Sequence, residues 1–171
     1  MIRLAFGLAL FLASCTSSQN VADKPWPEKL QNIETGLKVE HSTDTVFATI
    51  NTKDPEKRGK YQMKFTTSVE SINEDLEVVE FGAYFWENEE WVLTSIYDRP
   101  FNQEEFKKWY GSEDGMIQLG KKYADMDNWL AKSDYLSGRQ CEALLYFIAK
   151  NSKGQKFMGA KEVVGVMKMK K

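Results

Sequence analysis

The chain has 171 residues, of which 28% are charged and 13% aromatic, and its formal net charge at pH 7 is −2. This length suits one domain behind a short leader, and the aromatic content can build a core without metals or crosslinks. Nucleic-acid-binding proteins usually carry a basic face, whereas acidic and basic residues are mixed along this chain. The composition therefore argues against nucleic acid as a partner.

The first fifteen residues have the pattern of an export signal. Arg3 precedes an apolar run of roughly ten residues, too short for a membrane-spanning helix, which needs about 20. The run ends in Leu12-Ala13-Ser14-Cys15, which resembles the lipobox of bacterial lipoproteins. The resemblance implies cleavage after residue 14, lipid on Cys15, and an anchor in the cell envelope. Thr16 stands where an aspartate would favour the inner membrane, which implies an outer-membrane protein facing the periplasm. The alternative is an ordinary signal peptide cut nearby.

A tether is expected directly after the lipidated cysteine. Residues 16–20 are small and polar, and Pro25-Trp26-Pro27 stiffens the chain because each proline fixes its own φ. We therefore divide the chain into a signal peptide (1–14), a lipidated cysteine with a flexible tether (15–35), and one domain (36–171).

Strand patterns dominate the domain. Apolar and polar residues alternate over 46–50 and 61–69, with the period of two that a half-buried strand requires. The run 76–86 breaks its alternation, which indicates a bulge. A turn at 88–90 predicts a hairpin with a return strand over 91–97. The apolar run 144–149 reads as a strand between two layers, with a return strand over 156–166.

One short helix is expected after Asn102, since Glu105 lies three positions on, as in a capping box, and Gly111 ends the pattern. Short strands at hairpin spacing, without alternating strands and helices, predict a mainly β fold. Our first choice is an antiparallel β-sandwich, immunoglobulin-like, with one short inserted helix. A small barrel is the second choice.

Motifs of catalysis are sparse. The single histidine, His41, lies in a polar stretch and reads as a surface or turn residue, and Cys141 opens an apolar run and reads as a buried structural thiol. The sequence has no glycine-rich phosphate loop and no nucleophile elbow. Whether the protein is an enzyme stays open, with a non-enzymatic role favoured.

Aromatic residues at predicted loops and strand ends are the main candidates for binding, because their faces can stack on sugar rings or anchor a partner protein. Core packing is the competing interpretation. The candidates are Tyr84, Trp86, Trp91, Trp109, Tyr110 and Trp129; Trp86, Trp91 and Trp129 are preferred among them, together with Tyr123.

A second candidate site is a cluster of oxygen donors within the segment 123–129. Asp125, Asp127 and Asn128 could contribute to a calcium site, although the segment lacks the glycine and distal glutamate of an EF-hand loop. The competing interpretation is a turn pinned by Tyr123 and Trp129. No other cofactor is expected.

An anchor, a tether and an aromatic-rich β domain together predict a lipid-anchored envelope protein. We expect a non-enzymatic binding or assembly module for an envelope protein or glycan. The alternative is a hydrolase of envelope or imported polysaccharide that uses a pair of carboxylates.

Overall fold

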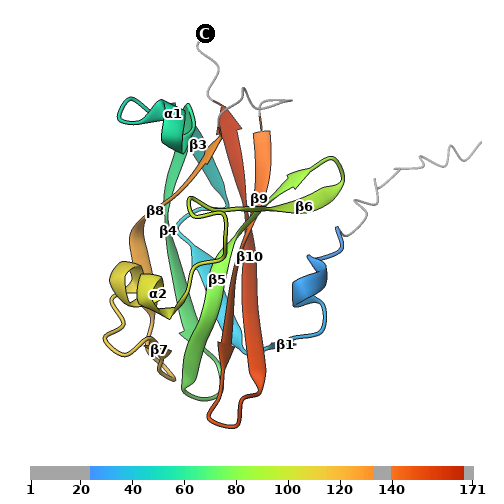
Figure 1. The fold of residues 1–171 in the computed structure, drawn as a ribbon, viewed down its shortest axis with the longest axis vertical. Helices are drawn as coiled ribbons and strands as arrows, with labels where there is room; N and C mark the ends of the chain where they lie inside the picture. The colour runs from blue at the N-terminus through green and yellow to red at the C-terminus, as the bar shows by residue number, and fades with distance from the viewer. Residues whose placement is uncertain (1–23, 133–139, 168–171) are drawn as a thin grey trace, which may run out of the picture.

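The computed structural model describes residues 24–132 and 140–167 (Figure 1). The expected signal peptide, Cys15 and the first part of the expected tether lie outside the described residues. Within the described ranges, no helix has both the length and the apolar character needed to cross a membrane.

The described chain is mainly β, as predicted, with three short helical segments. These are the 3-10 helix η1 (Glu28–Leu30) and the α-helices α1 (Pro55–Arg58) and α2 (Gln103–Tyr110). The strands are β1 (Glu34–Thr35), β2 (Leu37–His41), β3 (Thr45–Ile50), β4 (Tyr61–Ser71), β5 (Leu76–Glu87), β6 (Glu90–Thr94), β7 (Met116–Ile117), β8 (Tyr123–Lys132), β9 (Gln140–Lys150) and β10 (Lys156–Met167).

The strands form one ten-stranded sheet that curls on itself, in the order β2-β4-β3-β10-β9-β5-β6, with β8 paired to β4 and β7 paired to β5 (Figure 1). The expectation of a purely antiparallel sheet is wrong, because β10 pairs in parallel with both β1 and β3. The last strand lies between β3 and its own hairpin partner β9, and it runs antiparallel to β9 but parallel to β3. An immunoglobulin-like sandwich is not confirmed.

Local elements follow the sequence pattern closely. The hairpin between β5 and β6 turns at Asn88 and Glu89, whose φ angles of 51° and 65° suit the two-residue turns that match strand twist. The predicted bulge in β5 is present, as a register shift against β9 between Val78 and Glu80. Helix α2 begins after Asn102 and ends at Gly111, which takes the left-handed conformation.

Strand β9 is buried on both faces, as its continuous apolar run predicts. Alternate β9 residues, from Ala143 to Ala149, point into the curl and join two core clusters there. Leu144, Tyr146 and Ile148 point the other way, onto the outer surface of the sheet, which we call the convex face.

Residues 24–33, which we call the strap, cover part of the convex face. Leu30 is 1% exposed and packs with Tyr146 and its neighbours, while the Trp91 indole N–H donates to the carbonyl of Pro25 at 2.9 Å. Lys24 forms an ion pair with Glu142. The described part of the range expected as a flexible tether is therefore packed, because Leu30 supplies an apolar anchor.

Candidate functional site

A cleft of about 630 Å³ opens where the two edges of the curled sheet face each other. Strand β8 forms one edge, and β6 with the segment that follows it forms the other. Helix α2 lies between β8 and β5 and closes one end (Figure 1). At the far ends of these two strands, Lys132 on β8 and Glu87 on β5 form an ion pair at 2.6 Å across the gap.

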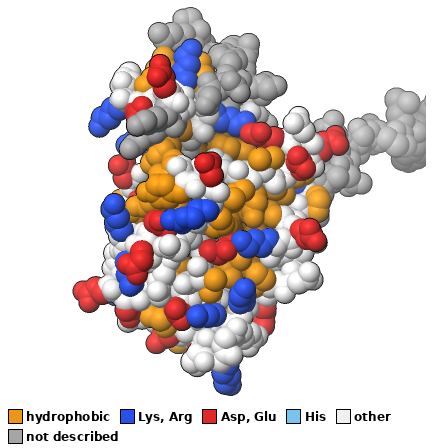
Figure 2. Space-filling model, in the orientation of Figure 1, with side chains coloured by type: hydrophobic (Ala, Val, Ile, Leu, Met, Phe, Trp, Pro, Cys, Tyr) orange, Lys and Arg blue, Asp and Glu red, His pale blue; other side chains and the backbone are white. Residues whose placement is uncertain are grey.

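The cleft has an apolar floor and mixed walls. Strands β5 and β9 supply the floor, and α2, β8 and the segment after β6 supply the walls. Figure 2 shows hydrophobic side chains exposed on this face of the molecule, among charged groups. The lining comprises Gly59, Phe81, Gly82, Ala83, Thr94, Ser95, Ile96, Tyr97, Phe101, Trp109, Tyr110, Asp125, Asp127, Asn128, Trp129, Leu130, Ala131, Leu145 and Phe147.

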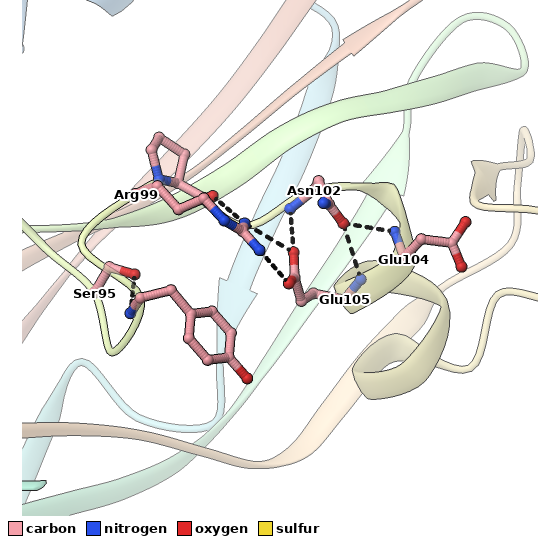
Figure 3. A network of polar contacts seen from close by, with 7 residues as sticks. Ser95, Arg99, Asn102, Glu104 and Glu105 are labelled. Carbon is pink, nitrogen blue, oxygen red and sulfur yellow. Dashed lines mark hydrogen bonds and ion pairs between the residues drawn. The ribbon is translucent and has the colours of Figure 1, made fainter. Parts of the chain in front are cut away.

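Helix α2 fixes the wall formed by residues 95–101 (Figure 3). The Arg99 guanidinium donates to both carboxylate oxygens of Glu105, at 2.7 and 3.2 Å, and Glu105 also accepts from the backbone N–H of Asn102 at 2.6 Å. The Asn102 side chain accepts in return from the backbone N–H groups of Glu104 and Glu105. Because Arg99 favours its ionised form, the pKa of Glu105 is lowered. One carboxylate thus caps the helix and holds the loop to it.

Aromatic rings make the end of the cleft beside α2 rigid. Phe81 stacks on Phe147, with ring centroids 5.5 Å apart and an interplanar angle of 7°. Trp109 presents its ring edge-on to Phe81 at 5.8 Å and to Phe101 at 4.7 Å. These rings pack on one another as core residues do, so the surfaces they show to the cleft are preformed.

Strand β8 brings the acidic residues to the cleft through an irregularity. Phe65 pairs with Asn128 but Thr67 pairs with Asp125, so β8 carries one more residue than β4 over this stretch. Half-burial raises the pKa of Asp125, and the neighbouring carboxylate of Asp127 raises it further. Asp127 is exposed and pairs with Lys64 at 3.0 Å, whereas no described lysine or arginine pairs with Asp125.

The residues singled out in the sequence fall in three places. Trp129 lines the cleft together with the three predicted calcium ligands. Trp86 and Trp91 contact each other at 5.0 Å beneath Lys24 of the strap, and Tyr123 is 3% exposed within the core. The interpretation of 123–129 as a turn is wrong, because this segment belongs to the bulged strand β8.

The oxygens proposed as calcium ligands are partly engaged by the protein itself. Asp125 accepts from the backbone N–H of Asp127 at 3.0 Å. The side-chain carbonyl of Asn128 accepts from the backbone N–H of Trp129, and its amide donates to Thr67. Across the part of the chain that the structure describes, no group of three or more histidine, cysteine, aspartate and glutamate side chains is placed to hold a metal ion. Calcium binding stays a prediction.

The sequence indicates only part of the cleft. Trp109 and Tyr110 are among the aromatic candidates, but they also fall on one face of a helix pattern that indicates core. The predicted return strand over 91–97 is too long, because β6 ends at Thr94 and residues 95–97 form part of the cleft wall instead. Only the pairing of distant strands brings these segments together, and no local signal records it. The hairpin and capping-box motifs could at most have shown that residues 95–101 form a structured connection.

No protein-family model matches the chain, and no curated protein matches it either.

Proposed function

We propose that this protein is a lipid-anchored module of the cell envelope, held in the outer membrane and facing the periplasm, that binds an envelope component in the cleft without transforming it. The carrying observation is the cleft itself, a preformed aromatic-floored cavity with a few polar groups on its walls. Its volume of about 630 Å³ lies within the range of small-ligand sites. The lipobox resemblance supports the envelope location.

The cleft combines the two properties that selective binding needs. Apolar and aromatic side chains from β5, β9 and α2 offer buried area, and carboxylate, hydroxyl and amide groups on the other walls fix orientation. The aromatic cluster and the Arg99–Glu105 pair hold these groups in place before a ligand arrives. Preorganisation of this kind lowers the entropy cost of binding.

The test compares envelope material retained by the full-length protein and by a variant with an obstructed cleft. Thr94 lines the cleft on the β6 side and is half-buried, so Thr94→Trp places an indole in the opening. Thr49→Trp is the matched control, because Thr49 is exposed on β3 outside the cleft. Fractionated envelope is passed over each protein, and the retained molecules are identified by mass spectrometry. We expect Thr94→Trp alone to lose them, and identical retention by all three proteins would remove the cleft from the proposal.

The anchor is tested separately. Cys15→Ala removes the sulfur that the lipobox resemblance implies as the lipid attachment point. We expect the variant to leave the membrane fraction when cells are broken and washed, since the lipid chains supply the membrane affinity. A variant that stays fully membrane-bound would contradict the lipoprotein assignment.

A second candidate function is the hydrolysis of a polysaccharide in the same cleft. The observation that favours it is the pair Asp125 and Asp127, which both line the cleft, and burial raises the pKa of Asp125 as a general acid requires. Release of new reducing ends from envelope glycans, abolished in Asp125→Asn, would establish this activity in place of simple binding.

A further inference from the structure

The charges on the cleft walls narrow the class of ligand. Among the described lining residues two are aspartates and none is lysine or arginine. Lys132, at the end of β8, is paired with Glu87, and Lys64 is paired with Asp127. Phosphates, carboxylates and other anionic groups would meet only like charge here, so the cleft suits neutral or cationic ligands.

Tyr110 brings a hydroxyl to the cleft that the protein leaves without a partner. Its ring stacks on Phe106 at 4.8 Å and meets Phe147 edge-on at 5.4 Å, and the residue is only 5% exposed. No group in the described parts of the chain forms a hydrogen bond with its hydroxyl. Within the described residues, a Glu142 carboxylate oxygen is the one enclosed polar side-chain atom without a hydrogen bond, so the Tyr110 oxygen keeps some exposure to the cleft and can pair with a ligand there.

Asp125 lines the same cleft as Tyr110. Burial raises the pKa of Tyr110, and the negative charge of Asp125 raises it further. The Asp125 carboxylate accepts one bond from the backbone of Asp127 and retains capacity for more. A tyrosine hydroxyl and a carboxylate acceptor therefore both line the cleft.

The Tyr110 hydroxyl and the Asp125 carboxylate together determine which kind of ligand group can bind to both of them. A hydroxyl can accept from Tyr110 and donate to Asp125 at the same time. An ammonium group only donates, and it would leave the tyrosine hydrogen without an acceptor. Trp109 and Trp129 add aromatic side chains to two walls. A pyranose ring presents both a C–H face and an edge of hydroxyls.

We propose that the cleft binds a neutral saccharide, with one sugar hydroxyl bridging the Tyr110 hydroxyl and the Asp125 carboxylate and a ring lying against the aromatic lining. This inference rests on the proposed function of the cleft and specifies its ligand.

The test is calorimetric titration of the full-length protein in detergent with neutral tetrasaccharides of glucose, xylose and N-acetylglucosamine. We expect at least one of them to bind. Tyr110→Phe removes a single oxygen and should weaken that binding about three- to tenfold, the usual effect of one hydrogen bond. Asp125→Asn should also weaken binding. Tyr84→Phe is the matched control, because Tyr84 lies in the convex-face cluster and should bind as the unaltered chain does.

Three outcomes would overturn the inference. They are no binding by any tetrasaccharide, equal binding by Tyr110→Phe and the unaltered chain, and retention in the cleft of an extended peptide or a cationic amphiphile in place of a glycan. If Thr94→Trp still abolishes retention of envelope material in any of these cases, the proposed function stands and only its saccharide specificity falls. If Thr94→Trp changes nothing, the cleft itself is not the binding site.

Discussion

His41 takes part in a short chain of hydrogen bonds at the edge of β2. Its Nε2 lies 3.1 Å from the carbonyl of Lys161, which can only accept, so Nε2 carries the hydrogen. Its Nδ1 lies 3.1 Å from the Thr67 hydroxyl, which in turn accepts from the Asn128 amide at 2.8 Å. The Thr67 hydrogen therefore points to Nδ1, and the neutral ring fits this arrangement. The expectation of a surface or turn histidine is wrong, since the ring is half-buried in a strand.

This arrangement predicts a pH dependence of stability. The pKa of His41 is lowered from its ordinary value of 6.5, mainly by burial and also by the charge of Lys161. The hydrogen bond to the Lys161 carbonyl and the charge of Asp44 raise this pKa, but they only partly offset the lowering. The unfolded chain then binds a proton at a higher pH than the folded one, so stability falls as the pH drops from 7 through 6.5 and below. Urea unfolding between pH 7 and pH 5 should show this loss, and His41→Gln should show less of it. Parallel curves for the two proteins would contradict the prediction, because all other titrating groups are common to both.

At the scale of single elements, α2 depends on its first turn. Asn102 and Glu105 form a reciprocal capping box, and Arg99 joins the loop to it. Because the helix also carries Tyr110 and closes one end of the cleft, its first turn positions part of the cleft lining. A change at Asn102 should therefore affect both the stability of the protein and the shape of the cleft.

We expect Asn102→Ala to lower the free energy of unfolding by about 1 kcal/mol, the usual cost of a lost N-cap. Urea denaturation measures the change. Asn73→Ala is the control, because Asn73 is exposed and lies far from the helix start in sequence. Equal stability of the Asn102 variant and the control would show that the Arg99–Glu105 pair alone fixes the first turn.

Elements were predictable where their signal is local. Three local predictions are confirmed: the alternation over 61–69, the bulge in 76–86 and the capping box at Asn102. Each depends only on residues that are near one another in the sequence. The parallel pairing of β10 with β3 joins residues that lie more than a hundred positions apart, and neither strand carries a mark of it. Such pairings are decided by how the whole sheet buries its apolar faces.

At the scale of the molecule, the candidate site was predictable only in part, for the same reason. Asp125, Asp127, Asn128 and Trp129 stood out as a local cluster, and all four line the cleft. Tyr110 and Ser95 come from other segments, and their part in the site follows from the curl of the sheet. Trp86 and Trp91 were predicted to bind a ligand because they are aromatic and flank a turn. In the structure, the strap packs over them instead.

The strap should contribute to the stability of the whole sheet. Leu30 is fully buried against β9 and β10 on the convex face, so Leu30→Ala should lower the free energy of unfolding by about 2–4 kcal/mol. Ile50→Ala is the control, because Ile50 is 64% exposed. Denaturant unfolding of both variants checks this. A Leu30 variant as stable as the control would mean that the strap packs on the sheet without stabilising it.

Docking of the strap also sets how far the protein can reach. If Cys15 carries the lipid, Lys24 lies nine residues further along the chain, and nine residues at full extension span at most about 32 Å. If residues 24–33 were not packed on the sheet, the maximal distance between Cys15 and the folded domain would be about twice as long. The strap begins on the convex face, beside Trp91. The cleft lies elsewhere, at the gap between the two sheet edges. With a lipid on Cys15, the domain would therefore stay within a short distance of its membrane. Its ligands would be molecules that diffuse close to that membrane or extend towards it from the cell wall.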